Sequence, residues 1–491
     1  MLSIARTIAS LVGSGLLATA ATAAVGQDTA SLWREIARGD AEAALEMIEE
    51  NHPGARAEVG DAEFQARLES AREHVGERLP HVANYEGYSA LMLGLANDFG
   101  DGHIWSSAIL SANRVDWPGL VAERRAGRWV IGHDLNEGGE LSGAELVSCD
   151  GKAADAVGRE RIGQFRAAPD VEADLASNAY ALFIDDGNPF LQRPANCTFR
   201  LAGGAEVTRP LPWRTVSTAQ VQRDIGAVLQ QAAAGMGVEK FAGGYWIALQ
   251  SLSPEAEAVV AEVERLQAEL RAAPMVVIDL RGNGGGNSAY SSSIAALLAG
   301  PEAMQAIGDR ELPCAGAFWR ASAGNARAMR ALSDGARGAR AEWLGGIASE
   351  LEAAVAAGQT FSPELPACAS EVANAARPVG APPPLAATGR LVLVTDRACF
   401  SSCLIATDTF RRLGALHIGE ATDRSTRYME VREEVLPSGL RTFSTLMKLA
   451  LGAGDFGPYT PDIPYPGAMH DSYALKVWVA ALPAGEETAA R

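Results

Sequence analysis

Apolar residues between positions 245 and 300 alternate between short continuous runs and helical spacing. The runs at 245–249 and 275–278 predict buried β-strands, and apolar residues three and four positions apart over 254–272 predict a helix between them. A second helix is predicted over 288–298. This order of strand, helix, strand and helix indicates a right-handed crossover unit and therefore a parallel sheet.

The same pattern resumes near the C-terminus. A strand is predicted at 391–395, an amphipathic helix through Leu413, another strand at 416–420 and a last helix through Trp478. The intervening residues 301–384 are rich in Ala, Arg and Glu and predict further helix. We interpret them as an insertion, which either covers a cleft or forms a solvated helical excursion.

The N-terminal half divides into two patterns. Residues 29–100 place apolar side chains at helical spacing, whereas 115–205 contain short strand-like runs, clearest at 128–132 and at 145–151, which ends in an Asp-Gly turn. The whole chain therefore predicts an α/β protein. Its expected parts are a signal peptide (1–24), a helical region (28–110), a β-rich module (111–205), an α/β core (206–300 and 385–480) and a helical insertion (301–384).

The first 24 residues are typical of a secretory signal. Arg6 supplies a positive start, an apolar run follows over 8–17, and Ala21-Thr22-Ala23 is a small-residue cleavage site. No later run of apolar residues is long enough to predict a membrane span. We therefore expect an exported, periplasmic or secreted protein.

The formal charge of −18 and the pI near 4.9 argue against nucleic acid or an anionic membrane as a partner. Six cysteines fit an oxidising compartment. Their order suggests the pairs Cys149–Cys197, Cys314–Cys368 and Cys399–Cys403, although the last pair could also be free and buried. Zinc is disfavoured, because the chain has no Cys-x-x-Cys pair and no histidine at ligand spacing beside the cysteines.

A glycine-rich turn follows the strand at 275–278. Four glycines within the five residues 282–286 allow positive φ angles and bring N–H groups close to a bound group at the start of the next helix. The dinucleotide fingerprint fails, because Asn287 stands at its third glycine, and no Gly-Lys-Ser/Thr follows to make a phosphate loop. An oxyanion hole and a tight structural turn remain as interpretations.

A second strand-to-helix turn contains Ser401 and Ser402. A serine there can be a nucleophile stabilised by the helix N-terminus, or simply a helix cap. Ligands gather at the carboxyl ends of parallel strands, so this turn and the glycine-rich turn should lie together.

These segments resemble the C-terminal processing (tail-specific) serine peptidases. The matching motifs, in chain order, are Asp279-Leu280-Arg281-Gly282-Asn283-Gly284-Gly285-Gly286, Phe400-Ser401-Ser402, Gly419-Glu420-Ala421-Thr422 and Pro461-Asp462-Ile463. The resemblance implies a crotonase-like peptidase core. It also implies a PDZ-like character for the β-rich module, whose run from Glu145 to Gly151 ends in Asp-Gly.

One departure from this family concerns the general base. In the processing peptidases a lysine follows the Gly-Glu-x-Thr segment, but here the chain continues Asp423-Arg424-Ser425-Thr426-Arg427-Tyr428. The nearest downstream lysine is Lys448, in a different context, and arginine cannot act as a base because it stays protonated. Asp101-Gly102-His103 instead resembles the histidine turn of the tricorn-core branch, which also includes the interphotoreceptor retinoid-binding protein.

The resemblance implies Ser401 as nucleophile and His103 as base. The N–H groups of Ser402, Gly284, Gly285 and Gly286 would form the oxyanion hole. A carboxylate should orient the histidine, and Asp455 is the best positional candidate, followed by Glu430. No metal or cofactor is expected, and the substrate would be a polypeptide.

Two alternatives remain on the same fold. The retinoid-binding relatives carry ligands without required proteolysis, and a scaffold could retain a vestigial core. A serine-directed fluorophosphonate distinguishes them, because only an active peptidase should label Ser401. Other hydrolase motifs, Gly-x-Ser-x-Gly and His-Glu-x-x-His, do not occur. We expect His417, on an apolar strand, to be a packed core residue.

Overall fold

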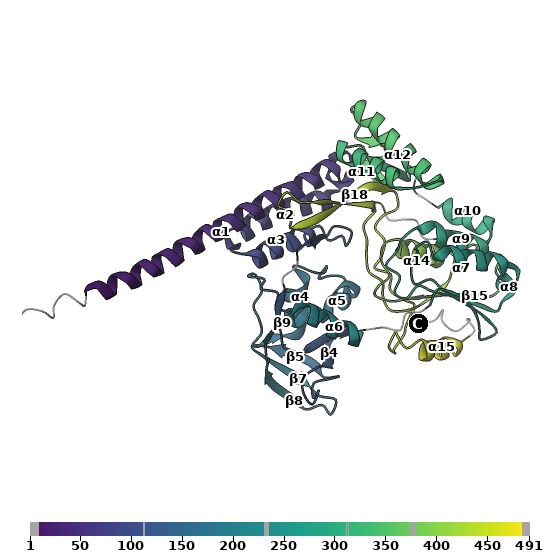
Figure 1. The fold of residues 1–491 in the computed structure, drawn as a ribbon. Helices are drawn as coiled ribbons and strands as arrows, with labels where there is room; N and C mark the ends of the chain where they lie inside the picture. The colour runs from purple at the N-terminus through teal and green to yellow at the C-terminus, as the bar shows by residue number, and fades with distance from the viewer. Residues whose placement is uncertain are drawn as a thin grey trace, which may run out of the picture.

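The structure is a computed structural model that describes residues 9–110, 113–229, 235–310, 312, 314–372, 375 and 380–483, with only the backbone given for 9–28. Three bodies are visible in Figure 1: a helical layer on β18, a β-rich module below it and an α/β core beside both. The predicted signal peptide falls in residues 1–8, outside the described residues, and in the backbone-only stretch, so it stays a prediction. Within the described chain no helix combines the length and the apolar character needed to cross a bilayer.

The α/β core is built on a six-stranded sheet with the order β10-β11-β12-β15-β16-β19. Its strands are β10 (Gly237–Phe241), β11 (Gly244–Ala248), β12 (Met275–Asp279), β15 (Arg390–Thr395), β16 (Leu416–Gly419) and β19 (Ile463–Pro464). All neighbours from β11 to β19 pair in parallel, and β10 joins as an antiparallel edge. The predicted α/β class and parallel sheet are confirmed.

Both faces of this sheet are covered, which explains why its strands are apolar throughout. One face packs on α7 (Ala256–Arg265), α8 (Gln267–Ala272), α9 (Ser288–Ala299), α10 (Pro301–Gly308) and α14 (Ser402–Arg412). The other face packs on α15 (Ser472–Ala480). Alternate residues of β12 serve the two sides, since Val276 and Ile278 belong to the first cluster and Met275 and Val277 to the second.

The helical layer lies on a second sheet. Helices α1 (Ala9–Asn51), α2 (Ala62–Arg78) and α3 (Tyr85–Asn97) share an apolar core with the long strand β18 (Arg441–Leu451). Strand β18 pairs with β17 (Tyr428–Val435) along one side, and with β1 (Ser106–Ala108) and β13 (Gly316–Arg320) along the other. Short elements complete this region: η1 (Pro53–Ala55), η2 (Ala57–Val59) and η3 (Leu79–His81).

Helices make up much of residues 301–384. Helices α11 (Ala323–Gly335) and α12 (Ala339–Ala356) form a hairpin that packs on Trp319 and Met447, and β13 and β14 (Phe361–Ser362) extend the β18 sheet. Helix α13 (Ala369–Val372) follows. This stretch lines neither of the two cavities beside the β-rich module, so the described residues give no support to a cleft-covering role.

The β-rich module is an antiparallel sheet with the order β3-β4-β5-β7-β8. Its strands are β3 (Leu120–Arg125), β4 (Arg128–Asp134), β5 (Glu145–Cys149), β7 (Asn196–Arg200) and β8 (Glu206–Pro210), with β6 (Lys152–Ala153) at one end. Two helices and a 3-10 turn cover it: α4 (Ala154–Gly163), α5 (Glu172–Asn178) and η4 (Ala179–Phe183). A separate ribbon of β2 (Arg114–Trp117) and β9 (Arg214–Ser217) carries α6 (Thr218–Leu229).

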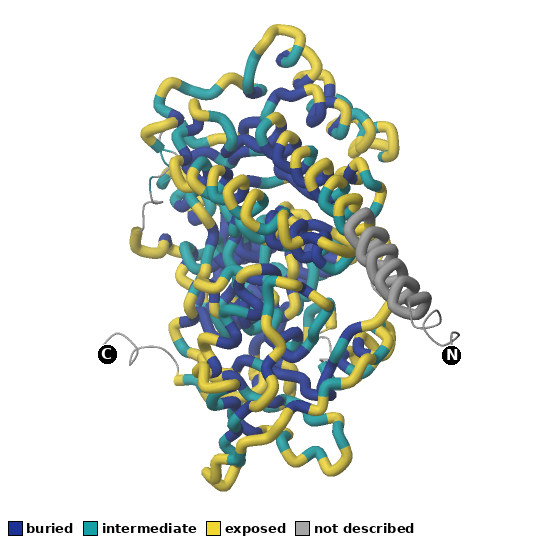
Figure 2. The backbone as a smooth tube through the Cα atoms, turned by 90° about the vertical axis from the view of Figure 1, so that its left-hand side faces the viewer, coloured by how far each residue is buried: buried dark blue, intermediate teal, exposed yellow. Residues whose placement is uncertain are grey.

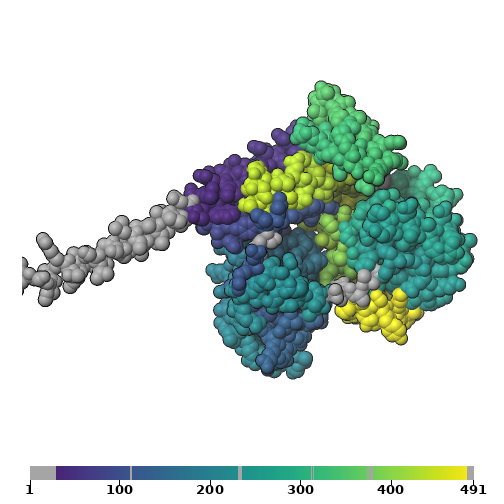
Figure 3. Space-filling view, in the orientation of Figure 1, coloured from purple at the N-terminus to yellow at the C-terminus, as the bar shows by residue number. Residues whose placement is uncertain are grey.

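All three predicted cysteine pairs form disulfides. Cys149–Cys197 joins facing positions of β5 and β7. Cys314–Cys368 joins the two ends of the segment 314–368, and Cys399–Cys403 flanks the serine turn. Figure 2 shows the buried residues gathered in the interior of the molecule and the exposed ones along its outside. Figure 3 shows the surface hollowed where the β-rich module faces the helical layer and the α/β core.

Candidate active site

Ser401 occupies a strained turn between β15 and α14. Its φ of 55° and ψ of −126° lie in a region that residues with a side chain rarely adopt. The residue is only partly buried and stands directly before the helix, where the backbone N–H groups favour negative charge. Strain of this kind persists only when the surroundings hold it, and it is common at active sites.

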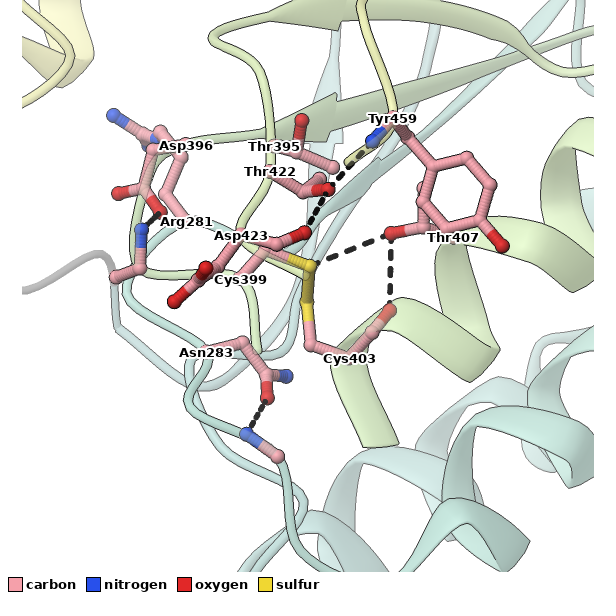
Figure 4. The surroundings of a disulfide bond; sticks show 12 residues. Arg281, Asn283, Thr395, Asp396, Cys399, Cys403, Thr407, Thr422, Asp423 and Tyr459 are labelled. Atoms are coloured by element: carbon pink, nitrogen blue, oxygen red, sulfur yellow. Dashed lines mark hydrogen bonds between the residues drawn. A yellow bond between two sulfur atoms is a disulfide. The ribbon is translucent and has the colours of Figure 1, made fainter. Parts of the chain in front are cut away.

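Asp396 ties the serine turn to the glycine-rich turn (Figure 4). It follows β15 and accepts the N–H of Gly282 at 3.1 and 3.0 Å on its two carboxylate oxygens, and that of Ala398 at 3.0 Å. The N–H of Phe400 donates to the carbonyl of Asn283 at 3.2 Å. Burial raises the pKa of Asp396 to about 6. The ends of β12 and β15 are thus joined at the place where the two turns meet.

The Cys399–Cys403 disulfide forms the other support of the turn (Figure 4). Both cysteines are fully buried. The hydroxyl of Thr407 lies 3.4 Å from the sulfur of Cys399 and donates to the carbonyl of Cys403 at 3.0 Å. The bridge therefore connects the residues before Ser401 to the first turn of α14.

The glycine-rich turn presses against Ser401. A Cβ atom at Gly285, whose φ is 103°, would lie 2.7 Å from the Cβ of Ser401 and 2.9 Å from the nitrogen of Ser402, so only glycine fits. The N–H of Gly285 donates to the side chain of Asn283 at 2.8 Å and is not free for a ligand. Among the residues that the structure describes, the N–H groups of Gly284, Gly286 and Ser402 have no acceptor. Three of the four predicted oxyanion-hole donors are therefore available.

The hydroxyl of Ser402 is already engaged, because it donates to the carbonyl of Gly286 at 2.6 Å. No such bond is made by the hydroxyl of Ser401 within the described chain. Of the two neighbouring serines, only Ser401 thus combines the strained backbone with a free hydroxyl.

His103 lies in the turn that links α3 to β1. Its Nδ1 is 2.9 Å from Oδ1 of Asp101, and the same oxygen accepts its backbone N–H at 2.9 Å. The second oxygen of Asp101 accepts the hydroxyl of Thr426. Burial by itself would raise the pKa of Asp101, but His103 and the hydrogen bonds from His103 and Thr426 lower it to about 2. An ionised Asp101 requires Nδ1 to carry a proton, which leaves Nε2 as the acceptor.

The histidine turn meets the serine turn through Phe400. The ring centroids of His103 and Phe400 are 4.5 Å apart, and a Cβ atom on Gly102 would lie 2.9 Å from the Phe400 ring. The absence of a side chain at Gly102 thus leaves room for the Phe400 ring. No hydrogen bond between His103 and Ser401 exists within the described residues.

The two carboxylates suggested by position lie elsewhere. Asp455 pairs with Arg427, from Oδ1 to Nε at 3.3 Å, and Glu430 pairs with Lys448 at 3.6 Å. In the described structure neither of these two carboxylates contacts His103. Asp101 makes the hydrogen bond to the histidine that was expected of Asp455. An available signal was the Asp-x-His spacing, because an aspartate often accepts the N–H two residues later.

His417 and Lys448 take no part in this arrangement. His417 is fully buried and hydrogen bonded to Thr395 at 2.7 Å, which confirms the expected packed histidine, and burial lowers its pKa to about 4. Lys448 lies over the ring of Trp319.

A cavity of about 460 Å³ opens behind the histidine turn. Its walls come from α3, residues 165–178 of the β-rich module and the core loop around Asp423. Burial and the neighbouring Asp174 raise the pKa of Asp423 to about 7. Arg424 pairs with Asp170 at 2.8 Å, so the module and the core are bridged beside this cavity. The described chain contains no group of three or more His, Cys, Asp or Glu side chains that could hold a metal ion.

The chain has relatives among known peptidases. Residues 245–442 match peptidase family S41. Mature CPAF in complex with lactacystin aligns with a TM-score of 0.57 at 12% identity, covering 91% of this chain and 97% of CPAF. Mature CPAF alone gives 0.57 at 13% identity, covering 88% and 93%. These values show a shared fold.

The tricorn protease aligns with a TM-score of only 0.32 at 12% identity, over 89% of this chain and 35% of that one, which decides nothing about the branch. No curated protein sequence matches the chain. Residues 245–442 are therefore similar to peptidase family S41, the C-terminal processing family of serine-type peptidases, and the chain shares the fold of mature CPAF.

Proposed function

We propose that the protein cleaves peptide bonds through an acyl-enzyme on Ser401, with His103 as general base and Asp101 as the carboxylate that orients it. The observation that carries this proposal is the juxtaposition of two turns. A strained serine with a free hydroxyl at a helix start packs, through Phe400, against a histidine bonded to a buried aspartate. A tight structural turn alone would not need the second half of this arrangement.

In the first step Nε2 of His103 takes the proton of Ser401 while Oγ attacks the carbonyl carbon of the substrate. The developing oxyanion is stabilised by N–H groups from Ser402 and from Gly284 or Gly286. The imidazolium then protonates the leaving amine, and the C–N bond breaks. Water, deprotonated by His103, finally releases the acid product.

This sequence of steps requires Ser401 and His103 to approach each other when substrate binds. Catalytic hydrogen bonds are often long before substrate binds and tighten in the reacting complex. The hydrogen bond between Nδ1 and Asp101 would hold the ring during this approach, with Nε2 left to meet the serine.

The test is labelling with a fluorophosphonate followed by peptide mapping. We expect the label on Ser401, loss of labelling and of peptide cleavage in Ser401→Ala, and retention of both in the matched control Ser402→Ala. Labelling of Ser402 would move the nucleophile by one residue. A wild-type protein that neither labels nor cleaves a peptide library would refute the proposal and favour a ligand-binding or scaffold role.

We also propose that the protein is exported. The support is the composition of residues 1–24, together with three disulfides in the described chain, a number typical of an oxidising compartment. Expression with its own N-terminus in a bacterium, followed by fractionation and N-terminal sequencing, tests this. A full-length protein confined to the cytoplasm would contradict it.

A further inference from the structure

A second cavity, distinct from the serine and histidine turns, lies between the helical layer and the β2–β9 ribbon. Its volume is about 570 Å³, within the range of roughly 300–1,000 Å³ usual for small-molecule sites. Much of its wall is apolar, and the apolar members include Leu93, Val115, Ile184, Val221, Ile225 and Leu229. The wall therefore suits the hydrocarbon part of a ligand.

Arg441 supplies the polar end of this cavity. The residue is 3% exposed, and three of its N–H groups are used. Nε donates to the hydroxyl of Ser106 at 2.9 Å, Nη2 to the carbonyl of Ser106 at 2.6 Å and Nη1 to the hydroxyl of Ser89 at 2.8 Å. Within the described chain no carboxylate forms an ion pair with it. The side chain of Tyr85 is a further hydrogen-bond partner, so Arg441 is a buried cation that has polar partners but no paired carboxylate.

Other charged groups at the cavity form no ion pair with Arg441 in the described chain. Asp186 pairs with Arg166 at 2.6 Å and favours the charge of Arg441 only from a distance. Glu86 on α3 also lines the cavity but is partly exposed and therefore hydrated. The guanidinium of Arg441 is the buried charge at this cavity, and burial lowers its pKa.

A comparison within the protein sharpens this point. Arg161 is also buried without a carboxylate, but it donates to the carbonyls of Leu182, Ile184 and Gln192 and does not line the cavity. Three strong acceptors thus satisfy a guanidinium that has no ligand to bind. Arg441 has one carbonyl, two serine hydroxyls and the side chain of Tyr85, and it lines the cavity.

We propose that this cavity is a binding site for a small amphipathic monocarboxylate, with its carboxylate on Arg441 and its hydrocarbon chain along α6. Carboxylate and guanidinium match in geometry and charge, and the apolar wall removes the chain from water. The bound ligand would touch α6 on one side. On the other side it would reach, through Arg441, the strand β1 that begins three residues after His103.

The test is calorimetric titration of the full chain with decanoate below its micelle concentration, with decan-1-ol and decylammonium as matched probes. We expect saturable binding of decanoate with one molecule per chain. Arg441→Gln should weaken it at least about tenfold, the minimum for losing a charged hydrogen bond, while decan-1-ol binds both proteins equally. This measurement needs no catalysis, so its result is independent of the peptidase proposal.

A second pair of variants keeps the test decisive if Arg441→Gln does not fold. Gly226→Phe adds an aromatic ring to the cavity wall, at a helical position with open space around it. Gly76→Phe makes the same change on α2, away from the cavity, also in open space. We expect at least tenfold weaker decanoate binding in the first variant and none of this loss in the second.

Three results would overturn the inference: no saturable binding of decanoate to the wild type, unchanged affinity in Gly226→Phe, or equally tight binding of decylammonium. Binding of an apolar peptide with a free carboxyl terminus, without binding of decanoate, would overturn it as well.

Discussion

Replacing Asp101 by asparagine tests the site where it differs most from the sequence-based expectation. The carboxylate is buried and lies 2.9 Å from Nδ1 of His103. Loss of one charged hydrogen bond costs about 1.5–3 kcal/mol, which corresponds to roughly 10- to 150-fold in rate. An asparagine that donates its amide proton to Nδ1 would also select the wrong tautomer, and that error alone costs about 10⁴-fold. We therefore expect kcat/KM of Asp101→Asn to fall between about 10² and 10⁴-fold.

The assay is hydrolysis of a fluorogenic peptide selected from a library, measured across pH, with thermal unfolding as a check on folding. Thr426→Val removes the second hydrogen bond to Asp101 and should cost less, about tenfold or under, because the carboxylate remains charged. Thr426→Ser should restore most of that loss. Asp455→Asn serves as the matched control and should stay close to wild type. The assignment of Asp101 is refuted if Asp101→Asn keeps wild-type kcat/KM while Asp455→Asn loses it.

Three further predictions use the same assay. A histidine base predicts that His103→Ala lowers kcat/KM by orders of magnitude, whereas Lys448→Ala costs little; the reverse pattern would restore a lysine base. Reduction of Cys399–Cys403 should lower activity more than Tm, because the closed loop is short and the bridge supports the nucleophile; an equal loss of both would contradict this. In the folded protein the pKa of Asp423 is raised to about 7 from an ordinary value near 3.8. Its contribution to the stability of the fold is therefore fully present below pH 3.8 and is lost as the pH rises to 7. Asp423→Asn should therefore raise Tm by a few degrees at pH 8 and by less at pH 5, and a Tm lowered at pH 8 would show that the carboxylate is instead held by Arg424.

The α/β core could be predicted because its strands are buried on both faces and its helices are amphipathic. Each element therefore has a clear hydrophobic pattern in its own stretch of sequence. The strands β17 and β18 were not predicted. Glu430 has a φ of 62° and interrupts the alternation of β17, and Arg432, Glu433 and Glu434 follow as a charged run. Helix α4 was also missed, because its ten residues include two glycines and little apolar periodicity.

The site shows the same division between local and distant signals. The serine and glycine-rich turns were recognised because each is one continuous motif after a strand. The partner of His103 was sought near Asp455, since a family resemblance gives order along the chain but not distance in space. Asp101 lay inside the histidine's own turn, and only the fold shows that Thr426, from the segment where the processing peptidases have a lysine, reaches the same carboxylate.

The two halves of the proposed catalytic apparatus belong to different bodies of the molecule. Ser401 rises from the α/β core, while His103 follows α3 and precedes β1, in the layer held together by β18. Where they meet, Phe400 touches Gly102, and Thr426 reaches Asp101. Catalysis therefore depends on how these two bodies pack against each other. A small displacement of one body relative to the other would abolish activity although both cores stay folded. Any agent that weakens or strengthens the contact between the two bodies would lower or raise peptidase activity without entering the substrate site.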